Sequence, residues 1–505
     1  MMKRRTFLST AGTSLAAAQP PSKPNILFVL WDDLGYPTLG TYGNKLVPTP
    51  NLDKLAREGV RFSSAYVTPQ CIPTRATLLT GQYTARNKMW HVIPYYHYPY
   101  GRVREEPFKE NRLRTDFTLA KGLQSAGYRT GIFGKWHLTA NEDGHYTNLK
   151  PEASRYYGFD VTSTPPKIPN EQNTGDKAVL RLTEECIQFM TETKSQPFFA
   201  YLPQHSIHGK VVAPLDLVDK YRKQGAPETG LNNSTYLAAL HHMDHSIGLL
   251  RTALEKSGQW NNTAVVFLSD NGGVARNHTP GPRPGADGKL RPEINIEEFP
   301  STPLRAWKGS AYEGGIRVPM LARFPGMQSS TGTTGRTIDT PVHAVDILPT
   351  FFSLAGARTP AGYVTDGVNL RGLIERNRPL PERDLFFYHP FYDQIWLHTP
   401  TAVVRSGRYK LIEYFGDWVD DETREYHPEP KLELFDLAAD IGERNNLAQA
   451  QPQRVAALRK KLHRWIADCG AKIPQANPNY DPTRALDSAR GKPTESSRLR
   501  RAVLS

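Results

Sequence analysis

The sequence predicts an α/β protein whose large, mainly parallel sheet is flanked by helices, followed by a smaller α+β subdomain with an antiparallel sheet. Three observations support this prediction. Short, continuously apolar segments recur along the first two thirds of the chain, helical segments separate them, and the pattern changes near residue 375. Apolar runs without polar alternation are typical of strands buried on both faces. Their alternation with helices is typical of a parallel sheet.

The first expected strand covers residues 25–31 and ends at Asp32-Asp33. The apolar runs that follow it predict strands at residues 128–133, 198–202, 264–268 and 318–323. Helices are expected between them at residues 117–126, 178–193 and 234–257. Gly258 is placed to end the last of these helices, because glycine readily adopts the left-handed conformation that follows a helix.

After residue 375 the expected strands are short and follow one another, which indicates an antiparallel sheet. They cover residues 383–389, 401–405, 409–414 and 432–436, and a charged amphipathic helix is expected at residues 453–469. The tail is polar, basic and contains proline, so we expect it to be disordered. The expected division is an export signal at 1–21, a large N-terminal domain at 22–375, a C-terminal subdomain at 376–476 and the tail at 477–505.

The N-terminus has the order of features that is typical of an export signal. Arg4-Arg5 lies in a charged twin-arginine region, residues 8–16 are weakly apolar, and Ala16-Ala17-Ala18 offers small residues for cleavage. A frayed basic tail is the alternative. No later segment approaches the ~20 apolar residues that a membrane span needs. We therefore expect an exported protein, periplasmic or secreted, with no membrane span.

Charge and cysteine content narrow the possible partners. The net charge of +13 favours anionic partners, but the sequence shows no nucleic-acid-binding signature, so we expect no nucleic acid.

The cysteines are too few for a disulfide framework, since there are only Cys71, Cys186 and Cys469. A Cys186–Cys469 bridge stays open, although two buried thiols in helices are the plainer interpretation.

Two polar pairs follow apolar strands and indicate a metal site. Asp32-Asp33 ends the first expected strand, and Asp270-Asn271 ends the strand at 264–268. Open α/β sheets place their sites at the carboxyl ends of strands. Three carboxylates and an amide oxygen converging there suit a hard divalent cation. Each pair taken alone could instead cap a helix or form a turn.

The segment Cys71-Ile72-Pro73-Thr74-Arg75, continued by Leu78-Leu79-Thr80-Gly81, resembles the signature of the sulfatase family. The resemblance extends over roughly residues 24–448 and implies an alkaline-phosphatase-like fold. In that family a formylglycine-generating maturation enzyme oxidises the signature cysteine to an aldehyde, so Cys71 is expected to become formylglycine. Thr74 departs from the serine that is commoner at its position. A structural cysteine at a helix start is the bland alternative.

The resemblance also implies the other site residues. The expected ligands of a calcium ion are Asp32, Asp33, Asp270, Asn271 and residue 71. Lys135 and Lys308 would neutralise charge on the sulfuryl oxygens, and Arg75 would hold the residue 71 hydroxyl and the calcium ligands in place. His137 is the expected base, His208 the expected acid, and His205 is expected to contact the sulfate or support His208. The prolines usual around the histidine pair are absent here.

The resemblance implies hydrolysis of sulfate esters on a sulfated polysaccharide or oligosaccharide. Of the two hydroxyls of a hydrated aldehyde, one would attack sulfur and the other would later release sulfate. The alternatives are a phosphate or phosphonate ester hydrolase of the same superfamily and a non-catalytic receptor for sulfated glycans. Residues 90–100, dense in aromatics, could stack on sugar rings, and residues 276–303 could form a lid. A plain surface loop is the alternative for either segment.

Overall fold

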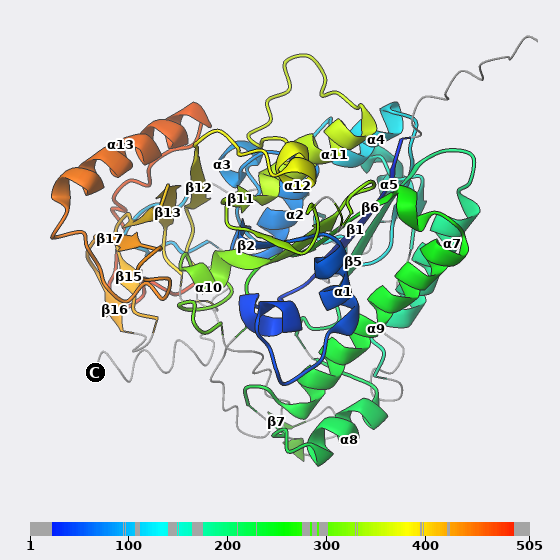
Figure 1. Cartoon of the computed structure of the whole chain (residues 1–505). Helices are drawn as coiled ribbons and strands as arrows, with labels where there is room; N and C mark the ends of the chain where they lie inside the picture. The colour runs from blue at the N-terminus through cyan, green and yellow to red at the C-terminus, as the bar shows by residue number, and fades with distance from the viewer. Residues whose placement is uncertain are drawn as a thin grey trace, which may run out of the picture.

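The computed structural model of the 505-residue chain shows a large sheet between helices and a smaller sheet beside it (Figure 1). The structure describes residues 23–488, apart from residues 94, 96, 107–111, 140–148, 150, 164–174, 210, 229, 275–282, 285–289, 292–300, 329, 331, 394, 395, 397 and 422–424. The expected export signal at residues 1–21 and most of the expected lid at 276–303 therefore lie outside the described residues.

The large sheet is mainly parallel, as predicted. Its strands follow the order β10-β2-β9-β6-β1-β5-β3-β4, and β11 also pairs with β2. Their bounds are β1 (Asn25–Trp31), β2 (Val60–Tyr66), β3 (Arg129–Ile132), β4 (Val161–Thr162), β5 (Phe198–Gln204), β6 (Thr263–Ser269), β9 (Arg317–Arg323), β10 (Arg336–Ile338) and β11 (Val342–His343). Only β9 among these strands runs antiparallel to its neighbours, β2 and β6. Its amino end therefore lies at the sheet edge where the other strands have their carboxyl ends.

Strand β1 is buried along its whole length because helices cover both faces of the sheet. Ile26, Phe28 and Leu30 belong to one hydrophobic core, which includes residues of α2 (Cys71–Thr80), α4 (Leu119–Ser125), α11 (Ile347–Ala355) and α12 (Arg371–Arg376). Leu27 and Val29 point to the other face, where the core includes residues of α1 (Pro50–Glu58), α7 (Val179–Glu192), α8 (Leu215–Lys223) and α9 (Ser234–Lys256). This alternation explains why the strand reads as a continuous apolar run.

The smaller sheet is antiparallel, as predicted, with the order β12-β13-β14-β17. Its strands are β12 (Asp384–His389), β13 (Thr401–Ser406), β14 (Tyr409–Tyr414) and β17 (Lys431–Asp436). Helix α13 (Pro452–Asp468) packs against it, with the Trp465 ring stacked on Phe386 at a centroid distance of 4.7 Å. The change of sheet type falls between α12 and β12, close to residue 375. The domain division itself stays a prediction.

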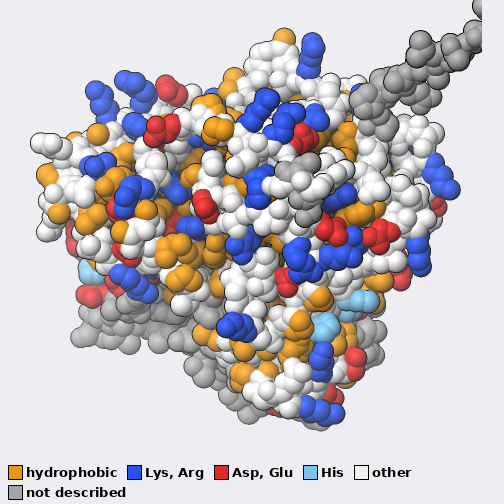
Figure 2. All heavy atoms as spheres, viewed as in Figure 1, with side chains coloured by type: hydrophobic (Ala, Val, Ile, Leu, Met, Phe, Trp, Pro, Cys, Tyr) orange, Lys and Arg blue, Asp and Glu red, His pale blue; other side chains and the backbone are white. Residues whose placement is uncertain are grey.

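Short elements complete the structure. They are α3 (Thr84–Asn87), α5 (Pro151–Tyr157), α10 (Glu313–Ile316), the hairpins β7 (Arg283–Pro284) with β8 (Leu290–Arg291) and β15 (Trp418–Val419) with β16 (Tyr426–His427), and the 3₁₀ turns at residues 36–38, 40–42, 260–262 and 344–346. No helix in the described part of the chain is long and apolar enough to cross a membrane. On the face shown in Figure 2, Lys and Arg side chains are dispersed among acidic and apolar ones.

The expectation of a disordered tail is wrong for residues 477–488. Asn477 N donates to the Arg102 carbonyl at 3.1 Å, and Leu486 is buried in a small apolar cluster with Tyr98 and Val103. Two apolar side chains in an otherwise polar segment are enough to anchor it, and composition alone concealed them. The remainder of the tail, residues 489–505, lies outside the described residues.

The three cysteines are free and buried. Cys186 lies within α7, and Cys469 is the residue that ends α13. This agrees with the interpretation of Cys186 and Cys469 as two buried thiols and excludes the bridge between them in this structure.

Candidate active site

The candidate residues meet at one edge of the large sheet because of strand direction and register. Strands β1 and β6 are adjacent and parallel, with Trp31 opposite Ser269. The pairs that follow them, Asp32-Asp33 and Asp270-Asn271, therefore emerge level with each other. Lys135 and His137 follow β3, and His205 and His208 follow β5, at the same edge. Because β9 is antiparallel, the segment before it brings Lys308 to this edge from the opposite chain direction.

The acidic cluster has the donor set that a hard cation requires. One carboxylate oxygen from each of Asp32, Asp33 and Asp270 lies within 4.8 Å of the others, and all three side chains are buried. Asp32 Oδ1 and Asn271 Oδ1 are buried and have no hydrogen-bond partner among the described residues. Buried polar atoms of this kind call for a partner. Oxygen atoms from carboxylates and an amide fit calcium or a similar ion.

The three carboxylates face three buried cations, which are Arg75, Lys135 and Lys308. Lys135 Nζ donates to Asp32 Oδ2 at 2.6 Å, and Lys308 Nζ donates to Asp33 Oδ1. Burial raises the pKa of Asp32, but the charges of Lys135 and Arg75 outweigh it and hold that pKa well below its usual range. Burial and Asp32 together raise the pKa of Asp270 to about 7. The charge of this cluster is therefore balanced closely, and each carboxylate depends on its neighbours for its ionisation.

Arg75 ties the site segments to one another. Its Nε and Nη2 donate to Asp270 Oδ2 at 3.0 and 2.7 Å, and its Nη1 donates to the Lys135 carbonyl at 2.9 Å. Nη2 also lies 3.6 Å from Asp32 Oδ2. The planar guanidinium suits this role because its donors are fixed in a fork.

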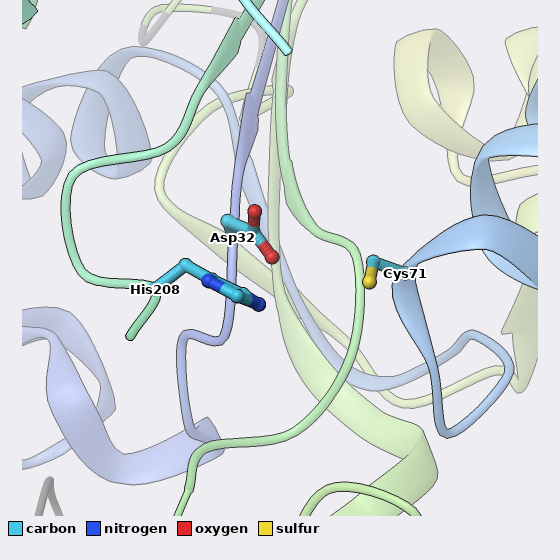
Figure 3. Close-up of side chains that lie close together, drawn as sticks. All are labelled: Asp32, Cys71 and His208. Carbon is cyan, nitrogen blue, oxygen red and sulfur yellow. The ribbon is translucent and has the colours of Figure 1, made fainter. Parts of the chain in front are cut away.

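Cys71 is the first residue of α2, directly after Gln70, which precedes the helix. Ligand atoms of Cys71, Asp32 and His208 lie within 4.8 Å of one another, and Figure 3 shows these side chains converging from three different segments. Burial raises the pKa of the Cys71 thiol, although Lys135 and Lys308 act in the opposite direction. An unmodified thiol with a raised pKa is a weak nucleophile at neutral pH.

The histidines of the site are held neutral by burial. The pKa values of His137, His205 and His208 lie well below the usual range, with burial as the main cause and positive neighbours adding to it. The His205 and His208 rings stack at a centroid distance of 4.9 Å. His137 and Asp33 both have positive φ, 57° and 63°. Such backbone conformations are costly for these residues and concentrate at functional sites.

The structure thus brings together all the site residues that the sequence suggested, and it adds others that sequence reasoning missed. Lys177 Nζ donates to the carbonyls of His208 at 2.5 Å and Gly209 at 3.2 Å. Trp396, from the segment between β12 and β13, lies beside Lys308, with Nζ 5.4 Å from its ring centroid. Lys177 and Trp396 belong to no motif, so only the three-dimensional packing reveals them.

Two large side chains of the aromatic segment at residues 90–100 are used for packing. Trp90 and Tyr98 are buried, and their rings lie 6.0 Å from Tyr388 and 5.8 Å from Tyr392. These two side chains are therefore not a free sugar-stacking rim. They pack against β12 through Tyr388 and against the segment that follows it through Tyr392.

Two family models match this chain. Residues 24–357 match the family model described as Sulfatase, and residues 307–472 match the model described as N-sulphoglucosamine sulphohydrolase, C-terminal.

Two curated relatives align over most of the chain. The arylsulfatase A of Bos taurus is 30% identical over 90% of this chain and 89% of its own length. The N-acetylgalactosamine-6-sulfatase of Mus musculus is 27% identical over 87% of this chain and 85% of its own length. The crystal structure of Ps i-CgsB in complex with k-i-k-neocarrahexaose is 25% identical, covers 91% of this chain and 95% of that chain, and has a TM-score of 0.66.

Proposed function

Because this chain belongs to the sulfatase family and is a sulfuric ester hydrolase, we propose that it removes sulfate from a sulfated polysaccharide or oligosaccharide through a formylglycine formed from Cys71. The observation that carries this proposal is the convergence of Cys71, Asp32 and His208 within 4.8 Å at the edge of the sheet. The glycan class is supported by relatives named for N-acetylgalactosamine-6-sulfate chemistry and by a similar structure that was determined with a neocarrahexaose. The net charge of +13 favours an anionic substrate.

The donor set described above fits calcium. Asp32, Asp33, Asp270, Asn271 and residue 71 would hold the ion, with the two unpartnered oxygens of Asp32 and Asn271 as its natural ligands. Bound there, a divalent cation supplies Lewis acidity to a sulfuryl oxygen and makes the residue 71 hydroxyl more acidic. The three carboxylates already balance Arg75, Lys135 and Lys308, so an added cation leaves the site positive and suited to a sulfate group.

A hydrated aldehyde at residue 71 supplies two hydroxyls on one carbon, one for attack on sulfur and one for later release of sulfate. The raised pKa of the Cys71 thiol supports such a modification, because the unmodified side chain is a poor nucleophile. The position of residue 71 at the start of α2 adds the positive end of a helix to the anion-binding side of the site.

The two lysines and the arginine have distinct roles in this proposal. Lys135 and Lys308 neutralise charge on the sulfuryl oxygens, because both ammonium groups are buried in the site, one against Asp32 and the other against Asp33. Arg75 has a positioning role. Its contacts to Asp270 and to the Lys135 carbonyl hold the helix of residue 71 against two other segments.

A neutral histidine can accept a proton, and it can donate one only after it has been protonated, which the negative charge of a bound sulfate ester favours. His137 serves as the base that takes a proton from the residue 71 hydroxyl, and His208 serves as the acid for the leaving oxygen. His208 is 13% exposed while Asp33 beside it is buried, which places His208 toward the side from which a bulky leaving group must approach. His205 stacks on His208 and restrains its ring.

The twin-arginine segment at the N-terminus supports export of the folded enzyme, to the periplasm or outside the cell. A formylglycine-generating maturation enzyme is then a required partner, and it would read the segment that begins at Cys71 before export.

The first test is the mass of the tryptic peptide spanning residues 62–75, from protein co-expressed with a formylglycine-generating enzyme, together with sulfate release from a panel of sulfated glycans. We expect the aldehyde in place of the thiol and release of sulfate from at least one glycan. A Cys71→Ala variant, purified in parallel, should show neither. A peptide that keeps its cysteine under conditions that convert a control sulfatase would refute the proposal. Conversion with release from small sulfates alone would refute only the glycan class.

A further inference from the structure

We propose that Trp396 is a specificity-determining residue whose indole stacks on the sugar ring that carries the sulfate, and that Asp393 is the positioning residue that holds this indole beside Lys308. This inference rests on the proposed function, since it names the part of the site that receives the leaving group. The two residues lie between β12 and β13, in the smaller subdomain, so the site draws on both sheets.

Gly309 allows the indole to lie directly against the backbone that follows Lys308. A Cβ added at Gly309 would meet Trp396 Cβ at 2.3 Å and Cγ at 2.4 Å, and the φ of +85° also favours glycine. Gly309 N donates to the Pro69 carbonyl at 2.8 Å. The indole is therefore seated on a segment that is itself bound to the chain leading into Cys71.

Trp396 borders the charged part of the site while keeping part of its surface open. Lys308 Nζ lies 5.4 Å from the ring centroid, a distance at which a cation is attracted to an aromatic face. Lys308 is buried, whereas Trp396 is only partly buried. The indole thus forms a partly exposed wall beside the ammonium group of Lys308.

One buried carboxylate fixes the position of this wall. Asp393 Oδ1 accepts a hydrogen bond from the Trp396 backbone N at 3.2 Å, and Oδ2 accepts one from Gln70 Nε2 at 3.0 Å. His91 Nε2 lies 3.0 Å from the same Oδ2. Asp393 therefore joins the turn of Trp396 to the residue directly before Cys71 and to the aromatic segment.

This arrangement suits a sulfated pyranose better than a flexible alkyl sulfate. An indole offers a flat apolar surface for the C–H face of a sugar ring, while Lys308 beside it meets the sulfate oxygens. An alkyl sulfate presents the same anionic group but no ring to stack. Loss of the indole should therefore weaken the sugar substrate selectively, mainly through KM.

The test compares Trp396→Ala and Trp396→Phe with the wild type, using the best sulfated sugar from the panel and a short alkyl sulfate. We expect Trp396→Ala to lower kcat/KM for the sugar about tenfold or more relative to the alkyl sulfate, and Trp396→Phe to restore most of the loss. Trp260→Ala is the matched control, because Trp260 lies just before β6, at the opposite end of that strand from Asp270. An equal loss on both substrates would overturn the specificity role.

Binding gives an independent readout through tryptophan fluorescence. The sugar should quench part of the fluorescence of the wild type, and this quenching should be missing in the Trp396→Phe variant. Quenching without turnover would refute the proposed function and leave the stacking role standing. Turnover on the sugar that does not change in the Trp396 variants would refute the stacking role and leave the proposed function standing. If the sugar neither binds nor turns over, both the proposed function and the stacking role are refuted.

Asp393→Asn tests the positioning role, with Asp366→Asn as the control, since Asp366 pairs with Arg86. We expect Asp393→Asn to raise KM for the sugar in the same sense as Trp396→Ala. A lower Tm with unchanged KM would show that Asp393 is merely structural.

Discussion

Arg75 donates two hydrogen bonds to a single carboxylate oxygen of Asp270, from Nε at 3.0 Å and from Nη2 at 2.7 Å, and both side chains are buried. This relationship joins the helix that begins at Cys71 to the end of β6. A third contact, from Nη1 to the Lys135 carbonyl, adds the segment after β3. Three elements that carry site residues are thus fixed by one side chain.

Arg75→Lys should therefore damage both turnover and stability. A lysine keeps the charge but cannot make the forked contact and reach the Lys135 carbonyl as well. We expect kcat to fall by about 100-fold or more, and the free energy of unfolding to fall by about 3 kcal/mol, as for a broken buried ion pair. Sulfate release and urea unfolding measure the two effects. Arg86→Lys, at the half-buried Arg86–Asp366 pair, should change both far less. Wild-type turnover in Arg75→Lys would contradict the role.

Calcium should stabilise the protein through the unpartnered oxygens of Asp32 and Asn271. A ligand that binds only the folded state adds about 2.7 kcal/mol at a concentration 100 times its Kd. We expect chelation to lower Tm, calcium to restore it, and Asn271→Leu to abolish the response. Asn262→Leu, at the other end of β6, is the control that should still respond. A calcium-dependent Tm in Asn271→Leu would argue against this ligand.

The parts of this fold that could be predicted are those determined by local pattern. Strand β1 was expected at residues 25–31 and is found at Asn25–Trp31, because burial on both faces leaves an uninterrupted apolar run. The acidic pairs were predictable for a related reason. Their position directly after β1 and β6 puts them at the edge where parallel strands end.

What could not be predicted depends on contacts between distant segments. The antiparallel direction of β9 brings Lys308 to the site edge. This direction depends on the topology of the whole sheet and cannot be inferred from residues 317–323 alone. Trp396 lies beside Lys308 although 88 positions separate the two residues in the chain, and the sequence around Trp396 has no motif. The short ordered part of the tail was missed because a few buried side chains outweigh a polar composition.

Lys177 should act as a positioning residue for the histidine pair. Its Nζ bonds the carbonyls of His208 and Gly209, and its own φ is positive at 46°. Lys177→Met removes these contacts at similar side-chain length, so His208 would lose its fixed position. We expect kcat to fall about tenfold, since misplacement near a reacting group is costly. The pH profile of kcat should change as well, a readout that a purely structural role would not move. Lys220→Met, on α8, is the control.

Lys410 should be essential for joining the two sheets. Its Nζ lies 3.0 Å from Glu313 Oε1 and 2.7 Å from Glu443 Oε1, and all three side chains are fully buried. Lys410→Met removes the cation that these two buried carboxylates share, which breaks the ion pair of Glu443 and leaves Glu313 with Arg317, 3.3 Å away. We therefore expect a loss of about 3–5 kcal/mol in the free energy of unfolding. Lys431→Met, at a partly exposed pair with Glu433, should cost about 1 kcal/mol or less. Equal losses in the two variants would contradict the central role of Lys410.

Glu105 should make stability depend on pH. Burial raises the pKa of this carboxyl from 4.5 to about 8, even though the backbone N atoms of Tyr392 and Tyr98 donate to it. A raised pKa means that the folded state binds the proton more tightly than the unfolded state. The contribution is therefore fully present below pH 4.5 and is lost as the pH rises toward 8.

The slope expected from Glu105 is at most about 1.4 kcal/mol per pH unit between these values. Urea unfolding at a series of pH values measures it, and Glu105→Gln should flatten the curve because the amide does not titrate. Glu382→Gln, at an exposed position, should leave the slope of the wild type intact. If Glu105→Gln kept the full slope, another group would be responsible. If the slope of Glu105→Gln had the opposite sign, buried histidines such as His343 and His398 would determine the pH dependence. Their pKa values are lowered in the folded state, so the protein loses stability as the pH falls below 6.5.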